Sequence, residues 1–319
     1  NACGPCPVAW AAMQAADPGR YPDPTYAALR RDLARFHGVD PARLVFVASA
    51  SEAIVRLTAW AVRLGCRTVA VPTHAYGDYA HAAAAWGLSP SVLGAEADLC
   101  WLCDPSSPLG QGLDLAGAPR GTRLTVLDRA YAPLRLTPGT PAPAATLDTV
   151  WQMWTPNKAL GLTGVRGAYL IAPAGAEGEA AALERLGPSW PLGAHAVAML
   201  QAWSGAAAQQ WLAASLDTLR EWTGTLRRSL GDQGWHCLPS DANFFCARPP
   251  QPLAPAVLAA HGVQLRDATS FGLPGHWRLG VLSPPAQAAL LSACQAATGT
   301  PASADMTAPQ APSIPTPHA

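Results

Sequence analysis

The chain of 319 residues has very little lysine: Lys158 is the only one, and the other basic residues are all arginine. Arginine replaces lysine freely on a solvated surface, where only the charge matters. It cannot replace lysine where the chemistry needs an amine that loses its proton and condenses with a carbonyl group. The sequence therefore predicts a chemical role for Lys158, against the alternative of one surface lysine retained by chance.

Charge and long apolar runs are also scarce. Charged residues make up 13% of the chain, hydrophobic residues 50%, and the formal net charge is zero. This composition favours a compact globular protein and gives no reason to expect nucleic acid or an anionic membrane surface as a partner. We find no run of 18 or more apolar residues and no secretory signal, so we expect a cytoplasmic protein without a membrane span.

The eight cysteines are too few for a disulfide framework in a chain of this length. The pair Cys3 and Cys6 has the spacing of a thioredoxin-type redox motif, but no predicted strand precedes it. The pair Cys100 and Cys103 falls in a predicted buried strand. A zinc site shared by the two pairs is a minor alternative. We interpret both pairs as small apolar packing residues and expect no metal.

Short apolar runs alternate with helical segments from about residue 26, which predicts an α/β fold with a mostly parallel sheet covered by helices. An N-terminal arm is expected at 1–25, a large domain at 26–200, a small α+β domain at 201–299 and a disordered tail at 300–319. The long helical region 194–231 is expected to be interrupted near Ser204 and Gly205. The predicted strands of the large domain are 44–49, 68–72, 99–103, 124–128, 150–154 and 167–171, its first helices are 52–64 and 79–86, and the small domain has predicted strands at 243–247, 263–266 and 277–281.

The segment TPNKALGLTGVRG, residues 155–167, surrounds the single lysine. It resembles the lysine motif of class I/II aminotransferases, in which Ser or Thr lies three residues before the lysine and Arg eight residues after it. The resemblance implies fold type I, with a large and a small domain, and the cofactor pyridoxal 5'-phosphate (PLP). Lys158 would bind the cofactor's aldehyde covalently. Thr155 and Arg166 would hold its phosphate, for which a hydroxyl and a guanidinium are suited.

Two further segments resemble cofactor-binding parts of the same family. In LTVLDRAY, residues 124–131, a predicted strand ends at Asp128, whose carboxylate can keep a pyridine nitrogen protonated. By resemblance, Tyr131 would hydrogen-bond the ring's phenolic oxygen. At Ala50 and Ser51 a strand meets a helix, where backbone N–H groups favour a bound phosphate.

The segment PTHAYGDY, residues 72–79, resembles the part of the family that stacks an aromatic ring on the cofactor. We prefer Tyr76 for this role. An apparent insertion makes the alignment ambiguous, and His74 and Tyr79 stay open as alternatives.

Three segments relate the chain to two members of the family, the histidinol-phosphate aminotransferases and the threonine-phosphate decarboxylases. In YPDP, residues 21–24, Tyr21 would reach the phosphate of the partner subunit's cofactor, which implies a homodimer. In RDATSFGLPGHWR, residues 266–278, Arg278 would clamp the substrate carboxylate and Arg266 would meet the substrate's own phosphate. The first five residues resemble the N-terminal arm that closes over the active site, and we expect this arm to pack with the small domain.

The sequence also departs from the family. Residues 104–110 read DPSSPLG where the family usually has NPNNPTG, so Ser107 replaces an asparagine that bonds the cofactor's phenolic oxygen. Ser107 has a shorter reach and one donor in place of two. Arg129 replaces the acidic residue usual after the strand-end aspartate. These departures leave open a degenerate PLP-binding protein with little turnover.

The expected function is that of a PLP-dependent aminotransferase that acts on a small, phosphorylated amino substrate of histidinol-phosphate type, with a keto acid as a possible second substrate. A threonine-phosphate decarboxylase of cobalamin biosynthesis is the second interpretation, because the same catalytic residues serve both reactions. The third is the binding protein without turnover. A thioredoxin-like redox protein would need a fold that the rest of the chain does not indicate.

Overall fold

The computed structural model describes residues 1–93, 96–113, 122–137 and 143–298, so the predicted tail at 300–319 lies outside the described residues. The helices are α1 Pro7–Gln14, α2 Ala27–His37, α3 Ala50–Arg63, α4 Gly77–Ala85, α5 Ala144–Leu147, α6 Glu177–Glu184, α7 Ala194–Trp203, α8 Ala206–Asp232, α9 Pro255–Ala260 and α10 Pro284–Thr298. The strands are β1 Leu44–Val47, β2 Thr68–Val71, β3 Ser89–Val92, β4 Leu99–Cys103, β5 Leu124–Asp128, β6 Trp151–Trp154, β7 Ala168–Ile171, β8 His236–Cys237, β9 Phe244–Arg248, β10 Arg266–Asp267 and β11 Trp277–Gly280.

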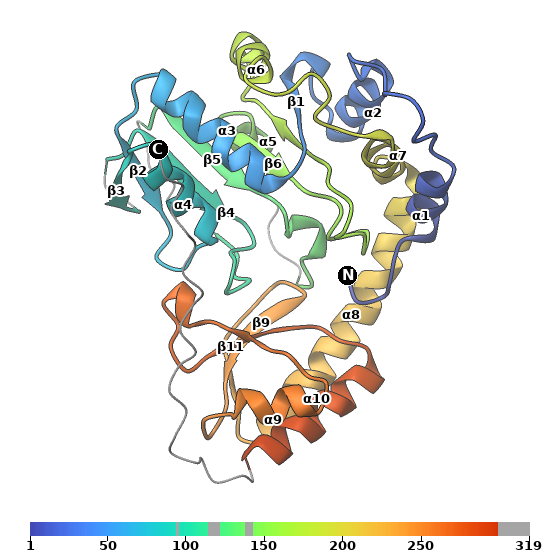
Figure 1. The fold of residues 1–319 in the computed structure, drawn as a ribbon, viewed down its shortest axis with the longest axis vertical. Coiled ribbons are helices and arrows are strands. Elements are labelled where there is room, and N and C mark those ends of the chain that lie inside the picture. Colours follow the sequence, from blue (N-terminus) through green and yellow to red (C-terminus); the bar gives the residue numbers. More distant parts are fainter. Residues whose placement is uncertain (94–95, 114–121, 138–142, 299–319) are drawn as a thin grey trace, which may run out of the picture.

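The large domain is built on a seven-stranded sheet in the order β1-β7-β6-β5-β4-β2-β3 (Figure 1). Neighbouring strands from β6 through β3 pair in parallel, and β7 alone runs antiparallel to both of its neighbours, β1 and β6. Strands β1, β4 and β7 are buried along their whole length, as expected for a parallel sheet with helices on both faces. The predicted α/β fold with a mostly parallel sheet is confirmed.

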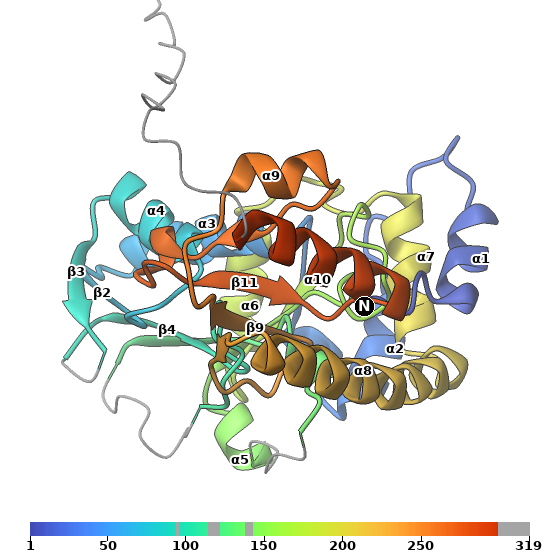
Figure 2. The same cartoon turned by 90° about the horizontal axis from the view of Figure 1, so that it is seen from below.

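Helices cover both faces of this sheet. On one face, α3, α4 and α6 pack in a core that includes Ile54, Tyr79 and Leu183. On the other face, α1, α2 and α7 and the first half of α8 pack in a second core, with Leu33 and Met199. Figure 2 shows α3 and α4 on one side of the sheet and α2, α5 and α8 on the other. The strand ends between these two layers are therefore shielded from solvent and can hold polar side chains in place.

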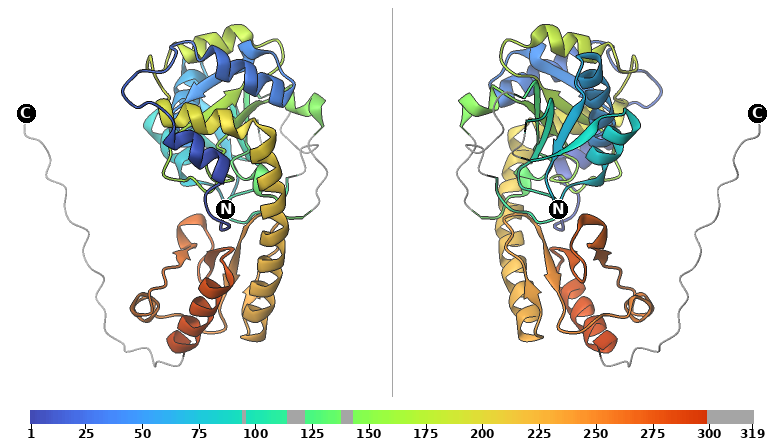
Figure 3. Two further views of the ribbon diagram at one scale, coloured as in Figure 1. Left: turned by 90° about the vertical axis from the view of Figure 1, so that its right-hand side faces the viewer. Right: turned by 90° about the vertical axis from the view of Figure 1, so that its left-hand side faces the viewer.

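The small domain has a four-stranded antiparallel sheet, β10-β11-β9-β8, with α9, α10 and the end of α8 packed on it. Helix α8 joins the two domains and is about 40 Å long at 1.5 Å per residue. Its residue Leu219 belongs to the core of the large domain, whereas Leu226 belongs to the core of the small domain. Figure 3 shows this helix running from one domain into the other. The boundary between the two cores therefore lies inside α8, and not at residue 200 as expected, because this one helix contributes residues to both cores.

The N-terminal arm also lies elsewhere than expected. Its helix α1 packs mainly against α7 and more lightly against α8, both beside the large domain, and not against the small-domain sheet. The Cys6 N–H donates to the Leu160 carbonyl at 2.8 Å, next to the lysine loop. Gly161 has φ +68°, and a Cβ there would lie 2.3 Å from the Gly4 carbonyl oxygen. The arm can approach the lysine loop this closely because residue 161 has no side chain.

Three smaller differences concern element bounds. Several elements are present without a corresponding prediction, among them β3, β8, α2, α5 and α6, and the strand expected at 263–266 is reduced to β10. The break predicted near Ser204 and Gly205 is confirmed, since α7 ends at Trp203 and α8 begins at Ala206. Among the described residues, no helix is both long and apolar enough to cross a membrane.

Candidate active site

The carboxyl ends of the central parallel strands surround a pocket of about 710 Å³, a volume that includes its opening to solvent. Asp128 is the last residue of β5, Thr155 follows β6, and Ser49 lies between β1 and α3. In open α/β sheets ligands bind at this edge, because the loops there diverge while the strands hold their first residues in register. The residues that line the pocket are Ser49, Ala50, Ser51, Tyr76, Cys103, Ser107, Asp128, Ala130, Tyr131, Thr155, Asn157, Lys158, Arg166, Gly167 and Arg278.

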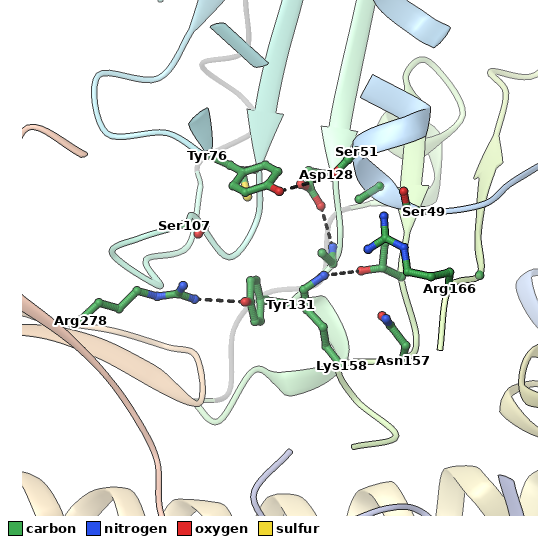
Figure 4. Close-up of a pocket in the computed structure, with 15 residues that line it drawn as sticks. Ser49, Ser51, Tyr76, Ser107, Asp128, Tyr131, Asn157, Lys158, Arg166 and Arg278 are labelled. Carbon is green, nitrogen blue, oxygen red and sulfur yellow. Dashed lines mark hydrogen bonds between the residues drawn. The ribbon is translucent and has the colours of Figure 1, made fainter. Parts of the chain in front are cut away.

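Lys158 extends into the middle of the pocket (Figure 4). Its Nζ donates to the Thr155 hydroxyl at 3.1 Å and lies 5.5 Å from the centre of the Tyr131 ring. The loop that carries it is closed by backbone hydrogen bonds, including Leu160 N–H to Pro156 O at 2.9 Å. A primary amine is thus held at a defined position but keeps free N–H groups for a ligand.

Asp128 is buried at the end of β5, with 5% of its surface exposed. One carboxylate oxygen accepts the Tyr79 hydroxyl at 2.6 Å, and the other accepts the Ala130 N–H at 2.8 Å. Burial raises the pKa of Asp128, while the Tyr79 and Ala130 hydrogen bonds and the charge of Lys158 lower it. A cationic group placed against this carboxylate would favour its ionised form further.

Tyr79 and Tyr76 occupy different positions around the pocket. Tyr79 is fully buried and stacks on Trp101, with ring centres 4.7 Å apart. Its hydroxyl bonds Asp128, and Tyr79 itself is not among the residues that line the pocket. Tyr76 lies over the pocket, with its hydroxyl 3.4 Å from the Ser51 hydroxyl (Figure 4). His74 turns away, since its Nδ1 lies 2.7 Å from the Phe271 carbonyl oxygen of the small domain. Of the three, Tyr76 is therefore the aromatic ring available for stacking in the pocket.

One end of the pocket is suited to an anion. Helix α3 begins here, and its N-cap Ser49 accepts the Glu52 N–H at 3.1 Å. The Glu52 carboxylate in return accepts the N–H of Ala48, the residue before the N-cap, at 3.1 Å. The remaining N–H groups of the first turn and the helix dipole favour negative charge. Figure 4 shows the Arg166 guanidinium turned toward Ser49 at this end.

The opposite side of the pocket belongs to the small domain. Arg278 of β11 reaches in and donates to the Tyr131 hydroxyl at 3.1 Å (Figure 4). Its guanidinium carbon lies 3.9 Å from the centre of the Phe244 ring, which holds the side chain by a cation–π contact. The Arg278 Nε is buried without a hydrogen-bond partner. Ser107, almost buried, lines the pocket between Tyr76 and Arg278.

The charges of the pocket fit PLP. Lys158, Arg166 and Arg278 line it, and Asp128 is the one carboxylate among the lining residues. Neither Arg166 nor Arg278 forms an ion pair with a described residue. The cationic excess suits a phosphate dianion and a second anionic group. The end of the pocket at α3 suits the phosphate of PLP, the amine of Lys158 suits its aldehyde, and the buried carboxylate of Asp128 suits its ring nitrogen.

Two predicted residues lie outside this pocket. Tyr21 is 78% exposed and stacks on Trp190, with ring centres 4.6 Å apart. Arg266 is exposed on β10, where it contacts the Phe271 ring and the Ser270 hydroxyl. All the other predicted site residues line the pocket.

Three of the four paired cysteines are buried in packed parts of the fold. Cys6 is fully buried in the core beneath α1, and Cys100 and Cys103 are buried in β4. Within the described ranges, no three His, Cys, Asp or Glu side chains gather where a metal ion could be held.

Asn157 is a lining residue that sequence reasoning missed. Its Nδ2 donates to the Val165 carbonyl at 3.0 Å, which fixes the loop on both sides of Lys158, and its Oδ1 is buried without a partner. Its position beside the lysine was the available signal. Sequence spacing could not show whether the side chain faces the pocket or the protein interior.

The sequence matches the family model "Aminotransferase class I and II" over residues 95–296. The histidinol-phosphate aminotransferase of Erythrobacter litoralis is 30% identical, over 88% of this chain and 83% of that protein. A histidinol-phosphate aminotransferase of Caulobacter vibrioides is 31% identical, over 93% of this chain and 84% of that protein.

Solved structures share the fold at lower identity. The histidinol-phosphate aminotransferase of Sinorhizobium meliloti, solved with PLP, has a TM-score of 0.76 at 22% identity and covers 92% of this chain and 87% of its own. The L-threonine-O-3-phosphate decarboxylase of Porphyromonas gingivalis has a TM-score of 0.69 at 23% identity, with 86% and 90% covered. The family predicted from the lysine motif is thereby confirmed: the chain belongs to the class I and II aminotransferases, PLP-dependent enzymes of fold type I.

Proposed function

We propose that this aminotransferase acts on a small phosphorylated amino substrate of histidinol-phosphate type. The observation that carries the proposal is the position of Arg278, which enters the pocket opposite Lys158 and Asp128 and has no anionic partner among the described residues. Two relatives that align with most of this chain are histidinol-phosphate aminotransferases, which supports the same substrate class.

The lining residues divide the cofactor among them. Thr155, Arg166 and the start of α3 at Ala50 and Ser51 would hold the phosphate, and Lys158 would bind the aldehyde carbon. Tyr76 would cover one face of the ring, which its position over the pocket supports.

Asp128, Ser107 and Tyr131 would act on the ring itself. Asp128 would hold a proton on the ring nitrogen, because a cation placed against this buried carboxylate would favour its ionised form. Ser107 and Tyr131 would face the phenolic oxygen. When bound, the cofactor withdraws electrons from the substrate's α-carbon.

The proton transfers fall to Lys158. As a free amine in the pocket, Lys158 would remove a proton from the α-carbon and return one elsewhere, as general base and acid. Its Nζ lies within the pocket, 3.1 Å from the Thr155 hydroxyl. Arg278 would meanwhile orient the substrate's anionic group and so select which bond at the α-carbon breaks.

Two arginines of the small domain could receive two anionic groups. Arg266 and Arg278 stand directly opposite each other on β10 and β11, so their side chains leave the same face of the sheet. Arg278 reaches the pocket, while Arg266 stays at its outer side. Histidinol phosphate has a phosphate but no carboxylate, whereas the keto acid and its amino acid product have an α-carboxylate. We infer that Arg278 binds the α-carboxylate of the keto acid and its product, and that Arg266 meets the phosphate of the amino substrate.

A threonine-phosphate decarboxylase is the second candidate. The same pair of arginines suits a substrate with both a carboxylate and a phosphate, and a decarboxylase of this kind shares the fold. The two reactions differ in which group on the α-carbon lies perpendicular to the ring.

We further propose a homodimer in the cytoplasm. Tyr21 is exposed beside Trp190, away from the pocket of its own chain, as a residue that serves the partner subunit's site would be. The division into an arm, a large domain and a small domain is retained, with the boundary moved into α8.

The test is a substrate screen with the PLP-loaded protein. Histidinol phosphate with 2-oxoglutarate should give glutamate, and threonine phosphate without a keto acid should release no carbon dioxide. Carbon dioxide release without an acceptor would replace the first candidate by the second. A cofactor absorbance that stays unchanged with every amino substrate would refute turnover and leave a PLP-binding protein.

A further inference from the structure

The first turn of α3 carries a carboxylate at the end of the pocket that suits an anion. Glu52 lies three residues after the N-cap Ser49, and its carboxylate accepts the Ala48 N–H at 3.1 Å. Ser49, Ala50 and Ser51 line the pocket, whereas Glu52 does not. An acidic side chain in the first turn stabilises a helix N-terminus, but its charge repels another anion that binds there. The charge of Glu52 therefore works against a phosphate at this end unless a cation offsets it.

Arg56, one turn further along α3, supplies that cation. Its Nε donates to the Glu52 carboxylate at 2.6 Å, and its Nη1 donates to the Phe46 carbonyl of β1 at 3.2 Å. The Arg56 side chain is only 4% exposed, so salt and solvent screen its charge little. Gly187, which follows α6, leaves room for the guanidinium, because a Cβ there would lie 2.5 Å from the Arg56 Cζ. Arg56 and Glu52 together join the first turns of α3 to the end of β1.

Stability alone is a weak reason for a guanidinium at this buried position. The Arg56 Nη2 is buried without a hydrogen-bond partner, which costs free energy. A buried ion pair can often be replaced by apolar side chains without loss of stability. Among the described residues, Glu52 is the one ion-pair partner of Arg56. The charge of Arg56 is thus directed at the carboxylate that lies beside the anion end of the pocket.

We propose that Arg56 is a positioning residue that sets the affinity of the site for the cofactor's phosphate. It offsets the charge of Glu52 and holds that carboxylate in its contact with the Ala48 N–H. The remaining N–H groups of the first turn then meet the phosphate without an unpaired carboxylate behind them. Arg56 does not line the pocket, so it acts through Glu52 and the helix turn. The inference rests on the proposed placement of the phosphate at the start of α3.

The test compares PLP with pyridoxal, which lacks the phosphate. Cofactor-free protein is titrated with each compound in a buffer without phosphate, and visible absorbance gives the two dissociation constants. The ratio of these constants, compared with the wild-type ratio, isolates the contribution of the phosphate, since the ring and Lys158 are common to both titrations. In Arg56→Gln the affinity for PLP should fall roughly tenfold, while the affinity for pyridoxal should stay within about twofold of wild type.

Three further variants separate charge from shape. Glu52→Gln in the Arg56→Gln background removes the unpaired carboxylate but keeps an acceptor for the Ala48 N–H, so it should restore the wild-type ratio. Arg56→Lys keeps the charge and should stay within about threefold of the wild-type ratio. A tenfold loss in Arg56→Lys would show that charge is not what Arg56 supplies. The control is Arg63→Gln, which removes an exposed arginine from the other end of α3 and should leave the ratio unchanged.

The single variant Arg56→Gln is expected to fold. The Glu52 side chain is 31% exposed, so water can hydrate its charge once Arg56 is replaced. Circular dichroism checks this for each variant. If Arg56→Gln were unfolded, Arg56→Lys and the double variant would still decide the question, because both are expected to keep the wild-type ratio within about threefold.

Three results with Arg56→Gln would overturn the proposal. The first is an equal loss of affinity for PLP and pyridoxal, which would make Arg56 a structural residue only. The second is a wild-type affinity for PLP. The third is a reduced ratio that Glu52→Gln does not restore.

Arg166→Gln tests the proposed position of the phosphate separately, because Arg166 lines the pocket at the same end and should also lower the ratio. If Arg166→Gln lowers the ratio and Arg56→Gln does not, the inference about Arg56 fails and the phosphate position stands. If neither variant lowers it, the proposed phosphate position fails as well.

Discussion

The two walls of the active-site pocket are built in different ways. On the large-domain side, Asp128 and Thr155 follow buried parallel strands and are themselves almost fully buried. On the small-domain side, Arg278 lies on a half-buried antiparallel strand and Arg266 on an exposed strand of two residues. Parallel sheets are covered on both faces, whereas an antiparallel sheet can leave one face in water.

This difference separates the two tasks of the site. A cofactor that stays bound needs fixed partners, and buried strand ends supply them. A substrate that enters and leaves needs a wall with access to solvent. The hydrogen bond from Arg278 to Tyr131 is a direct link between the walls, and α8 holds the two domains together behind them.

The largest effect is expected at Lys158. Lys158→Ala should abolish the adduct that borohydride traps between cofactor and protein, and should lower turnover on the order of 10⁴-fold, because both the covalent partner and the proton carrier are lost. Mass spectrometry of the reduced protein measures the first effect. Lys158→Arg is the matched control, since it keeps the charge but cannot condense with an aldehyde. An adduct in either variant would remove the central role of Lys158.

The next effect tests how rigid the large-domain wall is. Asp128→Asn should lower turnover by about 10² to 10³-fold, because it removes a buried charge from the ring nitrogen. Tyr79→Phe should cost about tenfold, as expected for one hydrogen bond to a charged group. Steady-state kinetics measure both.

Tyr79→Phe also has a pH signature. Its hydroxyl lowers the pKa of Asp128, so its loss should raise that pKa further. The acid limb of cofactor binding should therefore move to higher pH, as followed by visible absorbance. Tyr76→Phe, which loses a longer contact to Ser51, should leave this limb in place. Equal shifts in the two variants would show that Tyr79 does not act through Asp128.

The small-domain wall should respond through the substrate alone. Arg278→Lys should lower kcat/KM by roughly 10- to 100-fold, since lysine cannot form the bidentate pair. Arg266→Lys should cost roughly tenfold or less, because the side chain is exposed and solvent screens its interactions. The cofactor absorbance should stay as in wild type for both. A lost cofactor band in Arg278→Lys would mean that the two walls are not independent.

The last prediction concerns stability on the far side of the sheet. His37 has its pKa lowered to about 4 by burial and by Arg129. Between pH 6.5 and 4 the unfolded chain takes up a proton that the folded chain does not, so stability should fall with pH across this window. The loss should be at most about 3 kcal/mol. Urea unfolding of the cofactor-free protein at pH 7 and 4.5 measures it.

The matched variant for this prediction is His37→Gln. Its amide can take the place of the His37 Nε2, which lies 2.7 Å from the Tyr169 hydroxyl, but it does not titrate. The difference in stability between the two pH values should therefore shrink. An unchanged difference would assign the acid sensitivity to other groups.

Local patterns predicted much of the fold and of the cofactor end. Thr155, Lys158 and Arg166 were expected in one site from their spacing, and all three line the pocket. They lie on one short loop between two neighbouring strands, β6 and β7. The buried strands were visible as short apolar runs. Strand β3, which reads SPSV, was missed because three of its four residues have no strand preference and its place at the sheet edge comes from pairing with β2.

Three side chains show what the sequence could not decide. Tyr76 and Tyr79 are three residues apart and could each face the cofactor in a sequence comparison. The packing of Tyr79 on Trp101 decides between them, because that contact buries its ring behind Asp128. Asn157 faces the pocket for a similar reason, since its amide is held by the Val165 carbonyl.

The sequence by itself determined the chemistry. One lysine, an aspartate at a strand end and an arginine eight residues after the lysine supply an amine, a carboxylate and a guanidinium, and each group has its own bonding pattern. The tertiary structure decided how these groups are shared among cavities. It turned Asp128 and its neighbour Arg129 into different pockets, and it carried Arg278 across from the other domain. Residue identity sets which bonds a group can make, but only the packing of distant elements sets which partners it meets.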